Sequence, residues 1–191
     1  MRREIQKIDQ IVAGSLAQIS KDSGKPLAET FLSADCIVIV DVSSSMEDRD
    51  ALDGKSRYET ACNELAALQK TLPGRIAVIA FSSTAVFCPN GIPLNMGGGT
   101  DLADALRFAK VADVDGMRFI VISDGQPDSE ERAMAIARSY KNKIDVVYVG
   151  PETRPTGRDF LMRLAQASGG QAVTADRVAQ LSTKVQYLLA A

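Results

Sequence analysis

The stretch IVIVDVSSS, residues 37–45, decides the fold prediction and the search for a site. With Cys36 it forms a short continuous apolar run rich in β-branched residues, which is typical of a strand buried on both faces of a parallel sheet. The run ends on Asp41 and continues into three consecutive serines. Because ligands bind beyond the carboxyl ends of strands in such sheets, this pattern indicates a polar site at that edge.

The remainder of the chain alternates apolar runs with amphipathic segments. Buried strands are predicted at 75–82, 117–125 and 143–150, and helices at 56–72, 100–112, 129–140, 158–168 and 176–190. A short strand at 84–88 follows a tight turn and is expected to be antiparallel at an edge, and 171–175 is a short final strand. The predicted fold is therefore α/β, a doubly wound and mostly parallel Rossmann-like sheet with helices on both faces.

The N-terminal region is predicted to add a helix to this fold. Apolar residues recur at helical spacing over 3–19, at Ile5, Ile8, Val12, Leu16 and Ile19. Gly24 and Pro26 then mark a linker, which divides the chain into an N-terminal helix and linker (1–34) and one domain (35–191). The helix either packs on the domain or docks a partner, and packing is the interpretation that we favour.

Composition excludes several classes of function. The chain of 191 residues has no histidine, which excludes Ser-His-Asp and Cys-His hydrolases and any zinc site with a His ligand within it. The net charge of −2 argues against a nucleic acid partner, because phosphate binding needs a basic face. The three cysteines are far apart and odd in number, and they are expected to be reduced and mostly buried.

The sequence also argues against a membrane location. No apolar run approaches the roughly 20 residues that a transmembrane helix needs. Lys7, Asp9 and Gln10 interrupt what would be the apolar core of a signal peptide. We therefore expect a cytoplasmic protein.

Oxygen-bearing side chains gather at the carboxyl ends of the predicted strands. Asp41, Ser43 and Ser45 follow the first strand, and in an extended stretch these three alternate residues point to one side. Thr100 follows three glycines (97–99), and Asp124 follows the strand at 117–125. A cluster that offers only oxygen suits a hard divalent ion such as Mg²⁺, Mn²⁺ or Ca²⁺.

These motifs resemble the metal-ion-dependent adhesion site of von Willebrand factor A domains. That site consists of a DxSxS motif, a distant Thr and a later Asp, which correspond here to DVSSS (41–45), GGGTD (97–101) and SDG (123–125). The pieces occur in the family's order, and the segment GKSRYETA (54–61) is also similar to the family. The resemblance spans roughly residues 35–190, and three ordered motifs are far more specific than DxSxS alone.

The resemblance implies a role for each matched residue. Ser43, Ser45 and Thr100 would bind the metal through their hydroxyls, and Asp41 and Asp124 would bind it directly or through water. The ion would keep one position for an oxygen from outside the chain, which in the family is often an Asp or Glu of a partner protein. The chain is therefore expected to be a metal-dependent binding module and not an enzyme. Small cytosolic bacterial or phage members commonly accompany an AAA+ ATPase or a stress-response complex.

Other interpretations of the same residues stay open at this stage. The ion could serve a metal-dependent hydrolase or phosphotransferase, although no Lys or Cys is evidently placed near the site. A vestigial, unoccupied site is a third alternative, against which the complete ligand set argues. Asp101 is expected only to complement the helix dipole. The acidic residues that follow the DxSxS motif are expected to form a solvated loop: Glu47, Asp48, Asp50 and Asp53.

Overall fold

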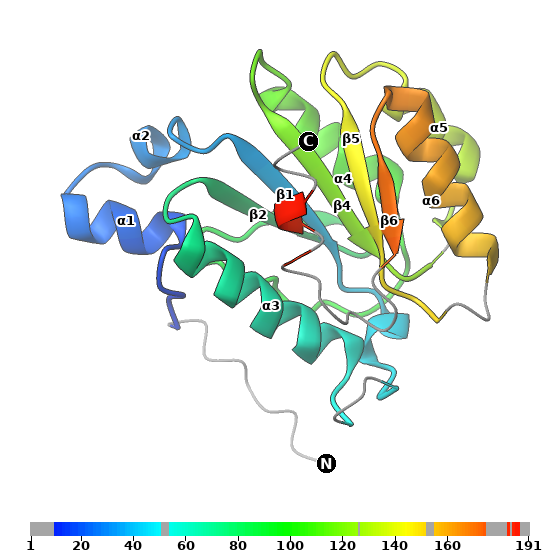
Figure 1. The fold of residues 1–191 in the computed structure, drawn as a ribbon, viewed down its shortest axis with the longest axis horizontal. Coiled ribbons are helices and arrows are strands. Elements are labelled where there is room, and N and C mark those ends of the chain that lie inside the picture. Colours follow the sequence, from blue (N-terminus) through cyan, green and yellow to red (C-terminus); the bar gives the residue numbers. More distant parts are fainter. Residues whose placement is uncertain are drawn as a thin grey trace.

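The protein, seen here in a computed structural model, is built on a six-stranded sheet in the order β3-β2-β1-β4-β5-β6 (Figure 1). The structure describes residues 10–50, 54–125, 127–151, 155–174, 183 and 185–187. The strands are β1 (Cys36–Asp41), β2 (Ile76–Phe81), β3 (Ala85–Phe87), β4 (Arg118–Ser123), β5 (Ile144–Tyr148) and β6 (Ala172–Thr174). Among the described strands only β3 runs antiparallel, and it lies at an edge, so the predicted sheet is confirmed.

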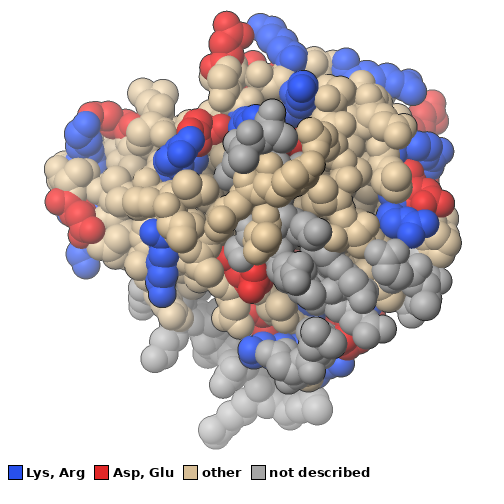
Figure 2. All heavy atoms as spheres, viewed as in Figure 1, with Lys and Arg blue, Asp and Glu red and all other residues tan. Residues whose placement is uncertain are grey.

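Helices connect the strands and cover the sheet. They are α1 (Leu16–Ser23), α2 (Leu27–Phe31), α3 (Arg57–Thr71), α4 (Leu102–Ala109), α5 (Glu130–Ala137) and α6 (Pro155–Ser168), with 3₁₀ helices η1 (Ser44–Glu47) and η2 (Lys110–Ala112). Among the described helices, none is long and apolar enough to cross a membrane. On the face shown in Figure 2, acidic and basic side chains lie next to each other around the margin.

The central strand β1 fixes where the site can form. It pairs in parallel with β2 and β4, with Cys36 opposite Ile76 and Arg118. All six of its residues are buried, because neighbouring strands and helix layers surround it on every side. The carboxyl ends of these parallel strands lie at one edge of the sheet, where the end of β4 lies beside the end of β1 (Figure 1).

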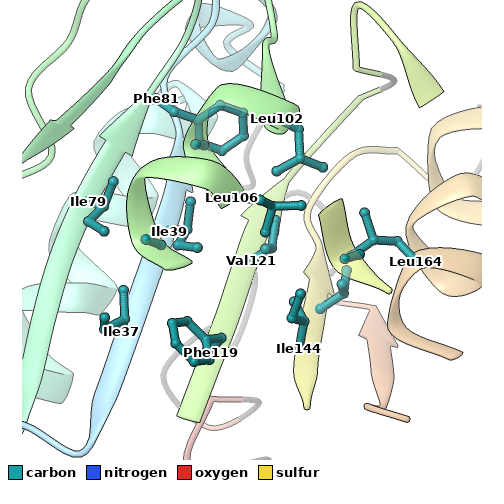
Figure 3. Close-up of a cluster of buried hydrophobic side chains, with 14 of the residues drawn as sticks. Ile37, Ile39, Ile79, Phe81, Leu102, Leu106, Phe119, Val121, Ile144 and Leu164 are labelled. Atoms are coloured by element: carbon teal, nitrogen blue, oxygen red, sulfur yellow. The ribbon is translucent and has the colours of Figure 1, made fainter. Parts of the chain in front are cut away.

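Alternation along the strands divides the core between the two faces. Ile37 and Ile39 pack with α4, α5 and α6 on one face, where Phe119 and Leu106 also lie (Figure 3). Val38 and Val40 point to the opposite face and pack with α3. Because both faces of the sheet are covered, a residue is buried whichever face it points to. The apolar runs of the strands are therefore continuous.

The predicted helix over 3–19 is wrong in its bounds. Residues 1–9 lie outside the described part of the chain, residues 10–15 are not helical, and α1 begins only at Leu16. Gly14 has a φ of 84°, in the left-handed region that interrupts a helix, and a Cβ there would lie 2.1 Å from the carbonyl oxygen of Gln69. Ser15 then caps α1 by accepting a hydrogen bond from the backbone N–H of Gln18.

The described part of this N-terminal segment packs on the domain. Leu16 is buried in the same core cluster as Ile37, and the backbone N–H of Val12 donates to the carbonyl of Asn90 at 3.0 Å. The predicted linker is largely helical, since it holds the end of α1 and the start of α2. The predicted C-terminal helix (176–190) lies mostly outside the described residues, but Val185 is helical and buried against the α3 face.

Two neighbouring residues of α4 test this account of the core. Leu106 is fully buried, whereas Phe108 is 44% exposed. We expect Leu106→Ala to lower the free energy of unfolding by about 2–5 kcal/mol, because it leaves a cavity against the sheet. Phe108→Ala should change it by no more than about 1 kcal/mol. Urea denaturation measures both, and similar losses for the two variants would contradict the packing described here.

Candidate metal centre

Asp41 is the first acid of the site, and its carboxylate is held on both oxygens. It ends β1 and is fully buried. Its Oδ1 accepts a hydrogen bond from the backbone N–H of Ser43 at 2.9 Å, and its Oδ2 accepts one from the Ser123 hydroxyl at 2.6 Å. Ser123 is the last residue of β4, so this contact ties together the carboxyl ends of two adjacent strands.

Asp124 is the second acid, and hydroxyls connect it to the segment after β1. Its side chain is fully buried, and its Oδ1 accepts a hydrogen bond from the Ser45 hydroxyl at 2.9 Å. The Ser45 and Ser43 hydroxyl oxygens lie 3.2 Å apart. The structure therefore brings four of the five predicted ligand residues into one hydrogen-bonded network at the carboxyl edge of the sheet.

Ser45 does not reach the network by the alternation of an extended strand, so that part of the prediction is wrong. Alternation in an extended chain was expected to direct the hydroxyls of Ser43 and Ser45 to one side. Instead, η1 begins at Ser44, so the backbone turns between the two residues. The two hydroxyls meet because the 3₁₀ turn folds Ser45 back toward Ser43, while Ser43 itself has an extended backbone.

Thr100 approaches the network through its glycine loop. The backbone N–H of Gly98 donates to the Ser44 hydroxyl at 3.0 Å, and that of Gly97 donates to the carbonyl of Val42 at 3.2 Å. At Gly98, two residues before Thr100, the loop thus lies directly against the DxSxS segment. Convergence of the Thr100 hydroxyl with the other four ligand residues stays a prediction.

The residue that caps α4 differs from the expectation. Thr100 was expected to stand at the helix start, and Asp101 to complement the dipole from the first turn. Asp101 is in fact the N-cap, because its side chain accepts a hydrogen bond from the backbone N–H of Asp104 at 3.0 Å. The hydroxyl of Thr100 is therefore not needed for capping.

Arg57 is the residue that sequence analysis missed. It begins α3, its side chain is only 2% exposed, and it forms an ion pair with Oδ2 of Asp124. It also donates to both carboxylate oxygens of Asp50, at 3.0 and 2.6 Å, and lies 3.3 Å from the half-exposed Asp48. Asp48 and Asp50 of the acidic loop are therefore ion-pair partners of Arg57, which a solvated loop was not expected to provide, while Asp53 lies outside the described residues. The only sequence signal was the position of Arg57 within GKSRYETA.

The electrostatics of the network favour a cation. Burial and, second to it, the nearby charge of Asp124 raise the pKa of Asp41 to about 6, although the hydrogen bonds from Ser123 and Ser43 act to lower it. Within the described part of the chain, no group of three or more His, Cys, Asp or Glu side chains is placed to hold a metal ion. An ion here would need the serine hydroxyls as well as the carboxylates, and this oxygen-only donor set fits Mg²⁺ or a similar hard ion.

Comparison with known proteins identifies the architecture. No protein-family model matches the sequence, and no curated protein matches it. A variant of an aerotolerance-related membrane protein from Bacteroides fragilis superposes with a TM-score of 0.66 and 17% identity over 82% of this chain and 98% of that chain. A von Willebrand factor type A structure from Catenulispora acidiphila gives 0.60 and 18% over 83% of this chain and 42% of that one. This chain has the von Willebrand factor A fold.

A third structural neighbour carries a metal. The manganese-loaded TRAP protein of Plasmodium vivax superposes with a TM-score of 0.53 and 16% identity, over 83% of this chain and 74% of that chain. At such identities the likeness establishes the fold alone. The likeness therefore assigns neither an ion nor a partner to this chain.

The raised pKa of Asp41 predicts a pH effect on stability in chelator-treated protein. Its folded-state pKa of about 6 exceeds the usual value of 3.8, so between these values the folded chain holds a proton that the unfolded chain has lost. Stability should therefore fall as the pH rises through this window. The Asp41→Asn variant lacks the carboxyl group that titrates. Its free energy of unfolding, relative to that of the wild type, should therefore increase from about pH 4 to pH 7. Urea denaturation across this range measures the difference, and a constant difference would contradict the shift.

The Arg57 ion pairs predict a large loss of stability when the guanidinium is removed. Arg57→Ala leaves the buried Asp124 carboxylate without its cation, which should cost about 3–5 kcal/mol of unfolding free energy. The control is Arg49→Ala, since Arg49 is 66% exposed and pairs with the partly exposed Glu59; it should cost about 1 kcal/mol or less. Equal losses for the two variants would show that the Arg57 contacts do not stabilise the fold.

Proposed function

We propose that this chain is a divalent-metal-dependent protein-binding module. Its ion, Mg²⁺ or the similar Mn²⁺ or Ca²⁺, would be held by Asp41, Ser43, Ser45, Thr100 and Asp124. The observation that carries the proposal is the hydrogen-bonded network of Asp41, Ser43, Ser45 and Asp124 at the carboxyl edge of the sheet. In doubly wound sheets this edge is where ligands bind.

The chain's own contacts prepare each carboxylate for an ion. Arg57 holds Oδ2 of Asp124, which leaves Oδ1 directed to the Ser45 hydroxyl. Ser123 holds Oδ2 of Asp41, while Oδ1 lies against the backbone of Ser43. Each acid is thus held by one donor outside the ligand set. Metal ligands in proteins are commonly oriented by such hydrogen bonds from neighbouring residues.

A bound ion would supply a coordination position for an oxygen from outside the chain. The proposed ligands include more neutral hydroxyls than carboxylates, so the ion would keep part of its positive charge. An Asp or Glu of a partner protein is the group that such a charge attracts most strongly. We therefore propose a protein partner that presents one acidic residue.

The class of partner follows from the resemblance alone. Small bacterial and phage von Willebrand A proteins point to an AAA+ ATPase or a stress-response complex in the cytoplasm. Binding, and not catalysis, is proposed because both carboxylates are contacted by hydroxyls, by the backbone N–H of Ser43 and by Arg57. The net charge of −2 supports a protein partner over a nucleic acid.

Metal binding itself is the first test. Calorimetric titration with Mn²⁺ should give one ion for each chain, and Asp41→Ala should abolish it. Ser44→Ala is the matched control one position before Ser45. Its hydroxyl contacts Gly98, but the backbone N–H of Ser44 also donates to the Gly98 carbonyl and survives the change, so Mn²⁺ binding should be retained.

The same two variants test partner capture. Ser44→Ala should recover the partners of the wild type in a pull-down, whereas Asp41→Ala or added chelator should lose them. Equal capture by both variants would mean that recognition uses another surface. Equal Mn²⁺ binding by both would remove Asp41 from the site.

A further inference from the structure

Three consecutive backbone N–H groups of the glycine loop donate to side-chain oxygens from three different parts of the fold. The acceptors are the residue that begins η1, a residue of the turn between β2 and β3, and an acid just before α5. The three pairs are Gly98 with Ser44 at 3.0 Å, Gly99 with Ser83 at 3.1 Å and Thr100 with Asp128 at 3.1 Å. The loop that carries Thr100 is therefore held from three directions.

Asp128 makes the closest connection to Thr100. Its carboxylate accepts from the backbone N–H of Thr100, and its own backbone N–H donates to the carbonyl of Thr100 at 2.9 Å. Both polar groups of the Thr100 backbone are thus bound by one residue. Because Asp128 directly precedes Ser129, the N-cap of α5, this pair also connects Thr100 to a helix.

The glycines make such an anchor necessary. Gly97 and Gly98 have φ values of 61° and 88°, and glycine loses more conformational freedom on folding than any other residue. A loop without side chains has no packing of its own to hold it in one position. Gly99 also leaves room for the anchor, because a Cβ there would lie 3.0 Å from Oδ2 of Asp128.

We infer that Asp128 is a positioning residue for metal binding, acting through the backbone of Thr100 and not as a ligand. The inference rests on the proposed function, since it assigns Thr100 to the ion. Asp128 contributes by accepting a hydrogen bond, and its negative charge is not required. The side-chain oxygen of Asn could accept the same bond, so the charge and the hydrogen bond can be separated by experiment.

The test compares Mn²⁺ affinities of variants by calorimetry. Asp128→Ala should weaken binding roughly ten-fold or more, the usual effect of removing a residue that orients a metal ligand. Asp128→Asn should bind within about two-fold of the wild type, since it keeps the acceptor. Glu131→Ala is the control for loss of a nearby exposed acid, and it should bind as the wild type does.

A double-mutant cycle distinguishes action through Thr100 from a direct effect. If Asp128 acts by placing Thr100, then Asp128→Ala should cause no further loss of affinity in a chain that already carries Thr100→Ala. An equal loss in both backgrounds, or an Asp128→Asn variant as weak as Asp128→Ala, would overturn the inference. So would wild-type affinity in Asp128→Ala. A wild type that binds no Mn²⁺ would instead refute the proposed function.

Discussion

Asp41 and Asp124 place two buried carboxylates at the carboxyl edge of the sheet, and the surrounding structure compensates for their burial. Burying a charge is costly unless it is paired and hydrogen-bonded. Here Arg57 supplies one positive charge, and hydroxyls of Ser45 and Ser123 supply hydrogen bonds. Even so, burial and the nearby charge of Asp124 raise the pKa of Asp41 to about 6, so part of the cost of burying this carboxylate remains.

The sheet is what brings these groups together. β1 lies between β2 and β4 in parallel register, so Asp41 ends its strand beside Ser123, and Asp124 follows one residue later. Both faces of β1 are covered, so close packing fixes where the strand ends. Segments far apart in sequence, at 43–45 and 123–124, therefore meet through geometry that the core determines.

The strands and four of the site residues could be predicted from sequence because their signals are local. A continuous β-branched run indicates a buried strand, and an acid followed by hydroxyls marks its end. Arg57 could not be found in this way, since an Arg at the start of an amphipathic helix is ordinarily exposed. Its burial depends on carboxylates 7 and 67 positions away. The start of α1 was missed because the close approach of Gly14 to the backbone of Gln69 is a tertiary contact. The contact between Asp128 and Thr100 likewise depends on the meeting of two loops.

A crystal structure of the protein grown with Mn²⁺, with the anomalous scattering of manganese recorded, tests the metal centre most directly. One strong peak is expected for each chain, about 2–2.5 Å from the hydroxyl oxygens of Ser43, Ser45 and Thr100. Asp41 and Asp124 should lie beside it, bound directly or through water. A chain without such a peak at this edge of the sheet, or with manganese held by other residues, would contradict the assignment of this network as a metal centre.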